Sequence, residues 1–451
     1  MLFERPGAGE RAVLVHVDFP DSDSDEDLSE LRELATSAGA VSVDALTTRR
    51  SAPDARYFIG TGKARELGAC VEEADADLVI FNHPLSPAQE RNLERLINRR
   101  VLDRIALILD IFAQRANTFE GKLQVELAQL RHLSTRLIRG WSHLERQKGG
   151  IGLRGPGEKQ LETDRRLINE RIRQIERRLE KVLSRRELSR RARRRAGAPV
   201  VSLVGYTNAG KSTLFNVLTG ADVGARNRLF ETLDPTLRRL EVGGVGEIIL
   251  ADTVGFIRRL PHDLVAAFRA TLEETRNAEL LLHVIDASAP DVAAKRDQVN
   301  AVLSDIGAAD VPQIEVFNKI DLLNGDSSGT RAAPRYPNPQ GPVQVRVSAR
   351  TGDGLENLRL ALESHFSRHL VRRRVRVPAT EPKLRARLFE LGTVVSERIV
   401  DNGDALMDVV LAPASFQRLC RSDGLARRVE EAGGESVAAE TRLVAAHSQR
   451  T

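Results

Sequence analysis

Residues 200–218 read VVSLVGYTNAGKSTLFNVL. Val200–Val204 is a short apolar run typical of a buried strand, and Thr213–Leu218 is predicted to be a helix. Between them stands Gly-x-x-x-x-Gly-Lys-Ser, from Gly205 to Ser212. A glycine-rich turn between a strand and a helix lets backbone N–H groups surround phosphates at the helix N-terminus. The stretch therefore predicts a phosphate-binding loop inside an α/β domain, and its context disfavours an ordinary glycine-rich turn.

Two side chains of this loop have specific predicted tasks. Lys211 should bridge the β- and γ-phosphates, and the Ser212 hydroxyl should ligate Mg²⁺. The full set of predicted loop contacts is Gly205, Tyr206, Thr207, Asn208, Ala209, Gly210, Lys211 and Ser212.

A second motif begins where the apolar strand Glu247–Ala251 ends. It is Asp252, Thr253, Val254 and Gly255. A carboxylate at the tip of a strand can orient the water shell of the metal, and the Gly255 N–H can sense a γ-phosphate.

A third motif, Asn318-Lys319-Ile320-Asp321, follows the predicted strand Gln313–Phe317. The Asp321 carboxylate can accept from both guanine N1–H and the exocyclic amine, which adenine cannot satisfy. Lys319 is predicted to cover the base plane. Ser348-Ala349-Arg350 follows the predicted strand Val343–Val347 and can offer a backbone N–H to guanine O6. Together the motifs predict a site for GTP, GDP and Mg²⁺.

A switch segment is expected between the first two motifs. It comprises Phe230, Glu231, Thr232, Leu233 and Asp234, followed by Pro235-Thr236. One threonine must reach the metal, and its distance from the phosphate loop favours Thr232 over Thr236, which stays an alternative. We therefore predict Lys211, Thr232 and Gly255 as catalytic residues, and Ser212 and Thr232 as metal ligands.

The residue after Gly255 is Phe256, where many GTPases have a water-orienting glutamine. Phenylalanine cannot orient water by hydrogen bonding. We predict slow intrinsic hydrolysis of GTP to GDP and phosphate, which needs a partner to complete the site.

The whole chain is long enough for about three globular domains. It has 451 residues, only two cysteines and a net charge of +5. Two cysteines exclude a disulfide framework and a cysteine-based zinc site. No run reaches the length of a membrane span, and Met1–Glu10 does not resemble a secretory signal. We expect a cytoplasmic monomer, with peripheral membrane association as an open alternative.

The basic charge is concentrated in Arg185–Arg195, which holds seven arginines in eleven positions. Such a cluster favours RNA or another polyanion, and a solvated basic helix is the alternative. DNA is not expected as a partner.

The first hundred residues alternate apolar and amphipathic runs. We predict strands at Ala12–Phe19, Ala40–Leu46, Leu78–Phe81 and Ile105–Phe112, with helical stretches at Leu28–Ser37 and Pro87–Arg99. This alternation is typical of a parallel α/β sheet.

Two heptad patterns follow, from Leu123 to Leu144 and from Leu161 to Val182, separated by the glycine-rich run Gly149–Gly157. They predict an antiparallel coiled coil with that run at its tip.

The resulting fold class is a multidomain α/β protein. Predicted domains are an α/β domain (1–115), the helical arm with its glycine-rich tip (116–196), a phosphate-loop GTPase domain (197–367) and a small α/β domain (368–451). The GTPase domain carries a predicted insertion at Asn324–Pro342. The last domain shows strand, helix, strand and helix signals at Val371–Val377, Leu384–Leu391, Asp404–Leu411 and Pro413–Cys420.

The chain resembles the HflX family of ribosome-associated GTPases over nearly its whole length. The resemblance lies in Tyr57–Lys63, Asp110–Ala116, Glu120–Leu130, His143–Gln147, Gly149–Glu158 and Thr232–Thr236. It implies hydrolysis of GTP, binding to the large ribosomal subunit and its RNA, and splitting or rescue of stalled ribosomes. Glu231 departs from the resemblance, since the family usually has a small residue there.

Two other functions remain open from the sequence. One is a regulatory GTPase whose arm binds proteins. The other is an RNA-remodelling enzyme that also uses ATP through its N-terminal domain, where Gly60-Thr61-Gly62-Lys63 resembles half a phosphate loop. We interpret that stretch as a loop entering a helix.

Overall fold

The structure is a computed structural model, and its chain divides into two compact units. The first contains Met1–Ser184, Gly224–Asp234 and Val254–Leu272, and the second contains Arg185–Val223, Pro235–Thr253 and Glu273–Thr451. The residues described are 9–20, 24–140, 156–196, 198–221, 229–243, 245–258, 269–323, 342–367, 371–411, 416, 419–420 and 424–430.

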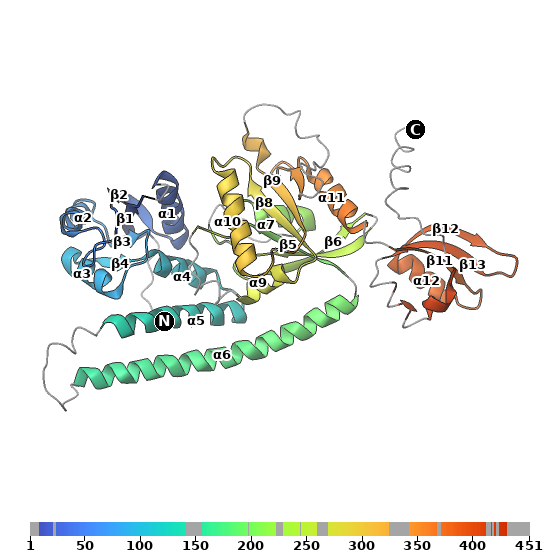
Figure 1. Ribbon diagram of the computed structural model, residues 1–451, viewed down its shortest axis with the longest axis horizontal. Helices are drawn as coiled ribbons and strands as arrows, with labels where there is room; N and C mark the ends of the chain where they lie inside the picture. Colours follow the sequence, from blue (N-terminus) through green and yellow to red (C-terminus); the bar gives the residue numbers. More distant parts are fainter. Residues whose placement is uncertain are drawn as a thin grey trace. The chain divides into compact units, whose positions relative to one another are not determined.

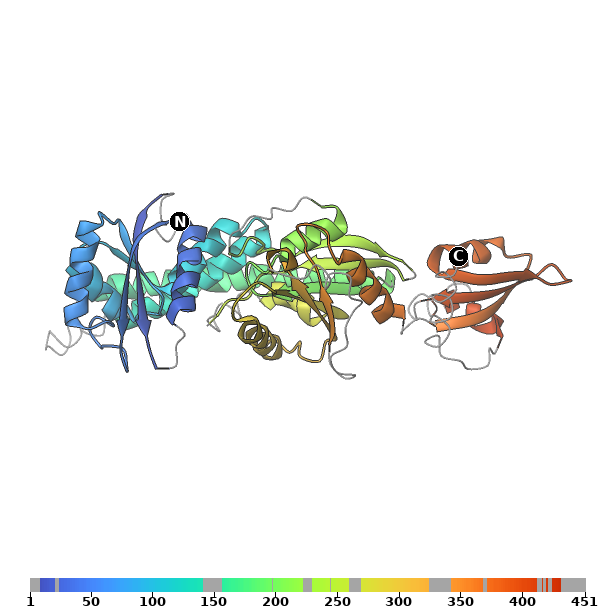
Figure 2. The same cartoon turned by 90° about the horizontal axis from the view of Figure 1, so that it is seen from above.

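The first unit contains a four-stranded parallel sheet in the order β2-β1-β3-β4. Its strands are β1 (Arg11–Asp18), β2 (Val41–Arg49), β3 (Leu78–Phe81) and β4 (Arg100–Leu102). Helices α1 (Ser24–Ala38) and α4 (Arg104–Arg115) lie on one face, and α2 (Thr61–Glu73) and α3 (Pro87–Ile97) lie on the other (Figures 1 and 2). Because both faces are covered, β1, β3 and β4 are buried along most of their length, whereas the edge strand β2 is largely exposed or half-buried. The predicted parallel α/β domain is confirmed.

The prediction of a strand at Ile105–Phe112 is wrong, since this run lies in helix α4. Apart from Asp110 the run is apolar, and such a run suits a buried helix as well as a buried strand, so its pattern alone cannot distinguish them. The deciding residue is Asp103, whose carboxylate accepts from the Ala106 N–H at 2.8 Å and caps the helix. The fourth strand is the three-residue β4 just before it.

The predicted helical arm consists of α5 (Phe119–Gly140) and α6 (Pro156–Ala196). The two helices lie side by side, with the end of α5 and the start of α6 at the same end (Figure 1). Their shared core holds Leu123, Leu127 and Leu130 against Ile175, flanked by Ile168, Ile172 and Leu179. These are the predicted heptad positions. Residues 141–155, which include Trp141 and most of the glycine-rich run, lie outside the described residues, and Pro156 and Gly157 begin α6.

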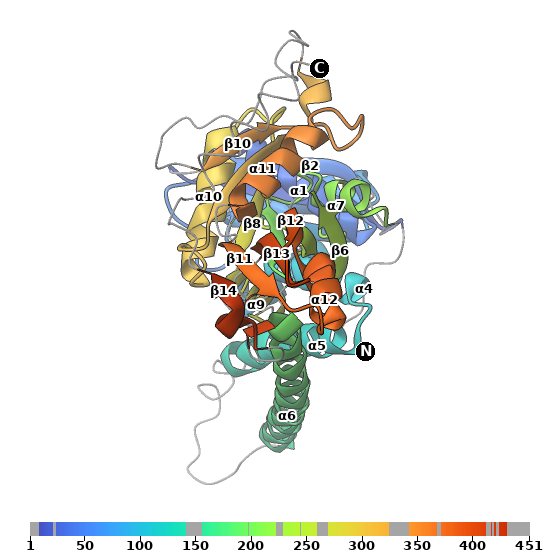
Figure 3. The same cartoon turned by 90° about the vertical axis from the view of Figure 1, so that its right-hand side faces the viewer.

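The second unit contains a six-stranded sheet in the order β10-β9-β8-β5-β7-β6. Its strands are β5 (Val200–Gly205), β6 (Thr236–Val242), β7 (Gly246–Asp252), β8 (Leu280–Asp286), β9 (Gln313–Asn318) and β10 (Val343–Arg346). Only the β6–β7 pair among them is antiparallel. Helices α7 (Lys211–Thr219) and α11 (Leu355–Ser367) pack in the main core on one face, and α10 (Val292–Asp305) lies on the other (Figure 3). Helix α9 (Arg269–Arg276) leads into β8. Of the predicted insertion Asn324–Pro342, residues 324–341 lie outside the described residues.

The C-terminal part has an antiparallel sheet in the order β12-β13-β11-β14. It consists of β11 (Val371–Val377), β12 (Thr393–Ile399), β13 (Ala405–Leu411) and β14 (Val429–Glu430), with α12 (Pro382–Leu391) packed on it. The sequence pattern missed β12, because Glu397 and Arg398 interrupt its apolar face. Among the described residues, no helix combines the length and apolar character that a membrane span requires.

Candidate nucleotide site

The phosphate-loop residues Gly205–Ser212 connect β5 to α7 at the carboxyl end of the parallel strands, where α/β sheets bind ligands. Two glycines are required by close contacts. A Cβ on Gly205, whose φ is +148°, would overlap the backbone oxygen of Val284 on β8. A Cβ on Gly210, whose φ is +89°, would overlap the Asn318 amide. The loop can therefore form only with a bare backbone at these positions.

Lys211 is buried at the start of α7, 6% exposed. Its Nζ donates to the carbonyls of Gly205 at 3.1 Å and Tyr206 at 2.7 Å. Burial lowers the pKa of Lys211 to about 8, a shift that the nearby Asp252 opposes. A buried ammonium held only by carbonyls is a suitable counter-ion for phosphate oxygens.

The two predicted neighbours of the metal lie together. The Ser212 hydroxyl donates to Asp252 Oδ2 at 2.8 Å, and Asp252 is fully buried at the end of β7. A hydroxyl and a carboxylate are hard oxygen donors of the kind that Mg²⁺ takes beside phosphates. The Thr207 hydroxyl is buried without a hydrogen-bond partner among the described residues. The residues therefore fit a magnesium-bound nucleotide.

Asn318 joins the phosphate loop to the base loops. Its Nδ2 donates to the Ala209 carbonyl at 2.8 Å, and its Oδ1 accepts from the Ala349 N–H at 2.9 Å. The Ser348 hydroxyl donates to Asp321 Oδ1 at 2.7 Å, which orients the predicted guanine-reading carboxylate. The motif Asn318–Asp321 and the segment Ser348–Ala349 are thus joined by hydrogen bonds.

Lys319 has a left-handed backbone, with φ +64°, and its Nζ lies 2.7 Å from Asp286 Oδ2. Burial alone would raise the pKa of Asp286, but hydrogen bonds from Lys319 and Ser288 hold it below its ordinary value. Asp286 was not predicted from the sequence. Asp286 stands at the carboxyl end of β8, which lies between β5 and β9, the strands that precede the phosphate loop and the Asn318–Asp321 motif. Ligands bind at this end of α/β sheets, so this position was the signal that could have identified Asp286.

The predicted switch segment belongs to the first unit. The Leu229 N–H donates to Ser37 Oγ of α1 at 2.9 Å, and the Phe230 ring meets Phe112 of α4 edge-on, with centroids 4.6 Å apart. The Glu231 carboxylate lies 3.9 Å from the Arg115 guanidinium. The residue that departs from the family resemblance therefore has a charge partner in the N-terminal domain.

The segment after Asp252 also contacts the N-terminal domain within the first unit. Phe256 and Ile257 are buried in the first unit, and the Arg258 guanidinium lies 3.6 Å from Asp27 Oδ1. The Arg258 carbonyl accepts from Arg104 Nη2 at 3.0 Å. A buried Phe256 ring offers nothing to orient water.

The structure thus places most predicted site residues in the second unit and the others in the first unit. The second unit holds Gly205, Tyr206, Thr207, Asn208, Ala209, Gly210, Lys211, Ser212, Asp252, Thr253, Asn318, Lys319, Ile320, Asp321, Ser348, Ala349 and Arg350. The first unit holds Phe230, Glu231, Thr232, Leu233, Asp234, Val254 and Gly255. The Thr253 hydroxyl donates to the Leu203 carbonyl at 2.5 Å, which indicates that this side chain braces β5.

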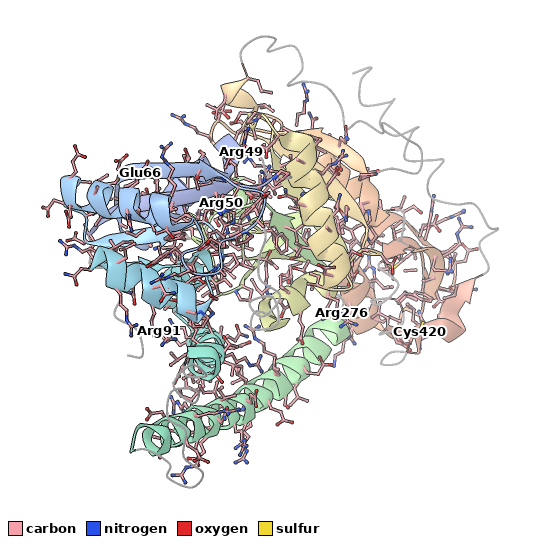
Figure 4. The ribbon with its side chains drawn as sticks, turned by 60° about the vertical axis from the view of Figure 1, so that its left-hand side comes forward. Arg49, Arg50, Glu66, Arg91, Arg276 and Cys420 are labelled. Atoms are coloured by element: carbon pink, nitrogen blue, oxygen red, sulfur yellow. The ribbon has the colours of Figure 1, made fainter. Side chains whose placement is uncertain are left out.

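The second glycine-lysine stretch is a loop entering α2, as predicted. Gly60 has φ +85°, and a Cβ there would overlap the Arg50 guanidinium, which donates to the Ile59 carbonyl at 2.9 Å. Figure 4 labels Arg50 at this position. The Lys63 Nζ lies 2.6 Å from Glu66.

Comparisons with known proteins agree with this geometry. Family models match residues 25–113 as "GTP-binding GTPase N-terminal", residues 115–193 as "GTP-binding GTPase Middle Region" and residues 200–319 as "50S ribosome-binding GTPase". The chain is 54% identical to the GTPase HflX of Escherichia coli over 423 residues, which is 94% of this chain and 98% of the relative. It is 46% identical to the GTPase HflX of Caldanaerobacter subterraneus over 394 residues, covering 87% and 89%.

Among solved structures, a GTP-binding protein of Sulfolobus solfataricus in complex with GDP aligns over 79% of this chain and 98% of its own. The identity is 24% and the TM-score is 0.43. Given its sequence relatives and its family models, the chain belongs to the HflX family of GTPases, and it binds and hydrolyses GTP.

Proposed function

We propose that this GTPase is a GTP-switched factor that binds the large ribosomal subunit and splits or rescues stalled ribosomes. The observation that supports this proposal lies within the first unit, where residues 229–234 and 254–258 pack against the N-terminal domain. The predicted phosphate-loop and base-loop residues belong to the second unit. Segments that sense the γ-phosphate are thereby in contact with a domain that has no phosphate loop of its own. Such an arrangement suits a switch whose output is the state of that domain.

RNA is the partner that the charge favours. Helix α6 ends in the basic run Arg185–Arg195, and basic side chains bind RNA mainly through its phosphates. The description of the family model for residues 200–319 names the 50S ribosome, which supports the large subunit as the particle. We expect a monomeric factor that works where ribosomes are, in the cytoplasm.

Five of the site residues have proposed roles in the binding and hydrolysis of GTP. Lys211 neutralises the β- and γ-phosphates, and Asp321 reads guanine. Ser212 and Thr232 would hold Mg²⁺, which supplies charge neutralisation between the β- and γ-phosphates. The Gly255 N–H would sense the γ-phosphate, and loss of that group on hydrolysis would release residues 229–236 and 252–256.

Stimulated hydrolysis is the first test. Because Phe256 cannot orient water, the isolated protein should turn over slowly, and purified large subunits should raise the rate at least tenfold at low salt. The stimulation should fall steeply with added salt, since phosphate contacts release counter-ions. Absence of stimulation at low salt would contradict the ribosomal role.

The arm supplies the second test. A deletion of Gly149–Gly157 should abolish subunit stimulation and ribosome splitting, yet leave the affinity for GTP and GDP unchanged. If splitting persisted in this variant, the arm would not be the acting part. In the alternative function the chain is a regulatory GTPase whose arm binds proteins. The GTPase rate would then not depend on ribosomal RNA.

A further inference from the structure

The carboxylate of Asp234 lies at the N-terminus of arm helix α5. It accepts from the backbone N–H groups of Asn117 and Thr118, each at 2.9 Å, and from the Thr118 hydroxyl. Thr118 Oγ1 in turn accepts from the Gly121 N–H at 2.9 Å. The first N–H groups of a helix lack partners within it, so the carboxylate and the hydroxyl together cap α5.

Gly121 makes this contact possible. A Cβ on Gly121 would overlap Asp234 Oδ1 and lie 3.1 Å from its Cγ. Glycine is a poorer helix former than alanine, so nothing in the helix itself favours it. Its role here is to let the Asp234 side chain, which is 116 positions beyond Thr118, approach the first turn.

The capping residue belongs to the predicted switch segment. Asp234 follows Thr232, the proposed metal ligand, by two residues, and two residues of extended chain span at most about 7 Å. Thr232 and Leu233 are buried, and the contacts of Leu229 and Phe230 with α1 and α4 fix the other end of the segment. The Thr232 side chain therefore cannot move far without moving the Asp234 carboxylate.

We propose that the Asp234–Thr118 cap is the link that passes the nucleotide state to the arm. The proposal rests on the switch role of residues 229–236 given above. In one nucleotide state the switch segment holds the Asp234 carboxylate on α5. In the other state Thr232 would bind Mg²⁺, and this movement would weaken the contact between Asp234 and α5. Linkage is reciprocal, so a contact that responds to the nucleotide must also bias the nucleotide. A helix cap of this kind changes an equilibrium about five-fold.

The test uses the full-length protein with substitutions outside the nucleotide site. Thr118→Ala removes one donor of the cap, and Gly121→Ala displaces the carboxylate while improving the helix. The measurement is the ratio of the dissociation constants for a non-hydrolysable GTP analogue and for GDP, with Mg²⁺ present. Each variant should shift this ratio about five-fold in the same direction, and the double variant should shift it no further.

Two matched controls accompany these variants. Thr118→Ser keeps the hydroxyl and should retain the ratio of the unmodified protein. Thr135→Ala removes a hydroxyl on the same helix that donates to the His132 carbonyl, and it should leave the ratio unchanged. A role confined to stability would leave the ratio constant in all variants.

Hydrogen exchange gives a second readout. The amides of Lys122–Glu126 in the unmodified protein should exchange at different rates with GDP and with the GTP analogue, and Gly121→Ala should abolish the difference. Ratios within two-fold of the unmodified protein, together with a retained exchange difference, would overturn the link while GTP binding and ribosome stimulation remained intact. If the unmodified protein showed no exchange difference between nucleotides, both the switch and the link would be wrong.

Discussion

The side-chain amide of Asn318 donates to the backbone carbonyl of Ala209 at 2.8 Å, and this bond ties the base-reading strand to the phosphate loop. The same side chain accepts from the Ala349 N–H. Because Gly210 lacks a Cβ, the amide can lie directly against the loop. The three parts of the nucleotide site therefore share one buried side chain.

Replacement of this amide by a carboxylate should loosen the site. Asn318→Asp keeps the shape and the acceptor for Ala349 but places an oxygen against the Ala209 carbonyl. The loss of a buried hydrogen bond costs about 1–3 kcal/mol, so GDP should dissociate roughly five- to hundredfold faster. Stopped-flow release of a fluorescent GDP measures this. Asn277→Asp, at an exposed amide that donates to the Glu273 carbonyl, is the control and should behave normally.

Gly205 in the phosphate loop and Gly220 at the end of α7 allow the steric effect of an added Cβ to be separated from its effect on the backbone conformation. Gly205→Ala meets the Val284 carbonyl, while Gly220→Ala, at φ +66°, meets nothing within 4 Å. The second change costs only the left-handed conformation, about 1–2 kcal/mol. The first should cost at least about 2 kcal/mol more, since paired strands cannot yield. Opening free energies from native-state hydrogen exchange of β5 amides measure both, and equal values would contradict the close approach.

The buried Lys211 predicts a pH dependence of nucleotide binding. Its pKa is about 8 in the free protein, below the ordinary 10.5, because it is desolvated. Bound phosphates should raise that pKa again, so binding above pH 8 must take up a proton. Affinity should then fall by up to about tenfold for each pH unit above 8.

The same shift affects the stability of the nucleotide-free protein. Between pH 8 and 10.5 the unfolded chain binds the proton more tightly than the folded one, so stability should rise with pH through this window. The proton uptake on nucleotide binding is measured by calorimetric titration in buffers of different ionisation enthalpy. Lys211→Arg keeps its charge at these pH values and should abolish this proton uptake. An unchanged uptake in that variant would assign the proton elsewhere.

The Ser212–Asp252 pair predicts how metal removal acts. In the unmodified protein a chelator should accelerate GDP release, because the proposed Mg²⁺ neutralises phosphate charge. Ser212→Ala removes one proposed ligand and leaves Asp252 without this 2.8 Å donor. Release should already be fast in the variant, and the chelator should change it less than about two-fold. A full chelator response in Ser212→Ala would remove Ser212 from the metal site.

The strands and the helix that flank the predicted nucleotide motifs could be predicted because each signal is local. A strand, a glycine turn and a helix start follow one another within twenty residues, and their chemistry follows from backbone rules. The two-helix arm was predictable for a similar reason, since its heptads repeat along one chain segment.

The failures concern information that is not local. The run Ile105–Phe112 is apolar except for Asp110, and its pattern suits a strand or a helix, so the cap residue Asp103 distinguishes the two. The contacts of Asp286 with Lys319 and of Asp234 with Thr118 were not predicted, because each joins residues far apart in sequence. The nucleotide contact of Asp234 stays a prediction, and in the structure its carboxylate caps α5. No periodicity reports a contact between residues 118 and 234.

The central claim is that GTP controls docking of this chain on the large ribosomal subunit. Co-sedimentation of the full-length protein with purified large subunits, at matched salt and Mg²⁺, tests it directly. We predict that the protein pellets with the subunits when a non-hydrolysable GTP analogue is bound, and at least tenfold less when GDP is bound. Equal pelleting in the two nucleotide states, or no pelleting with the GTP analogue at low salt, would contradict the claim.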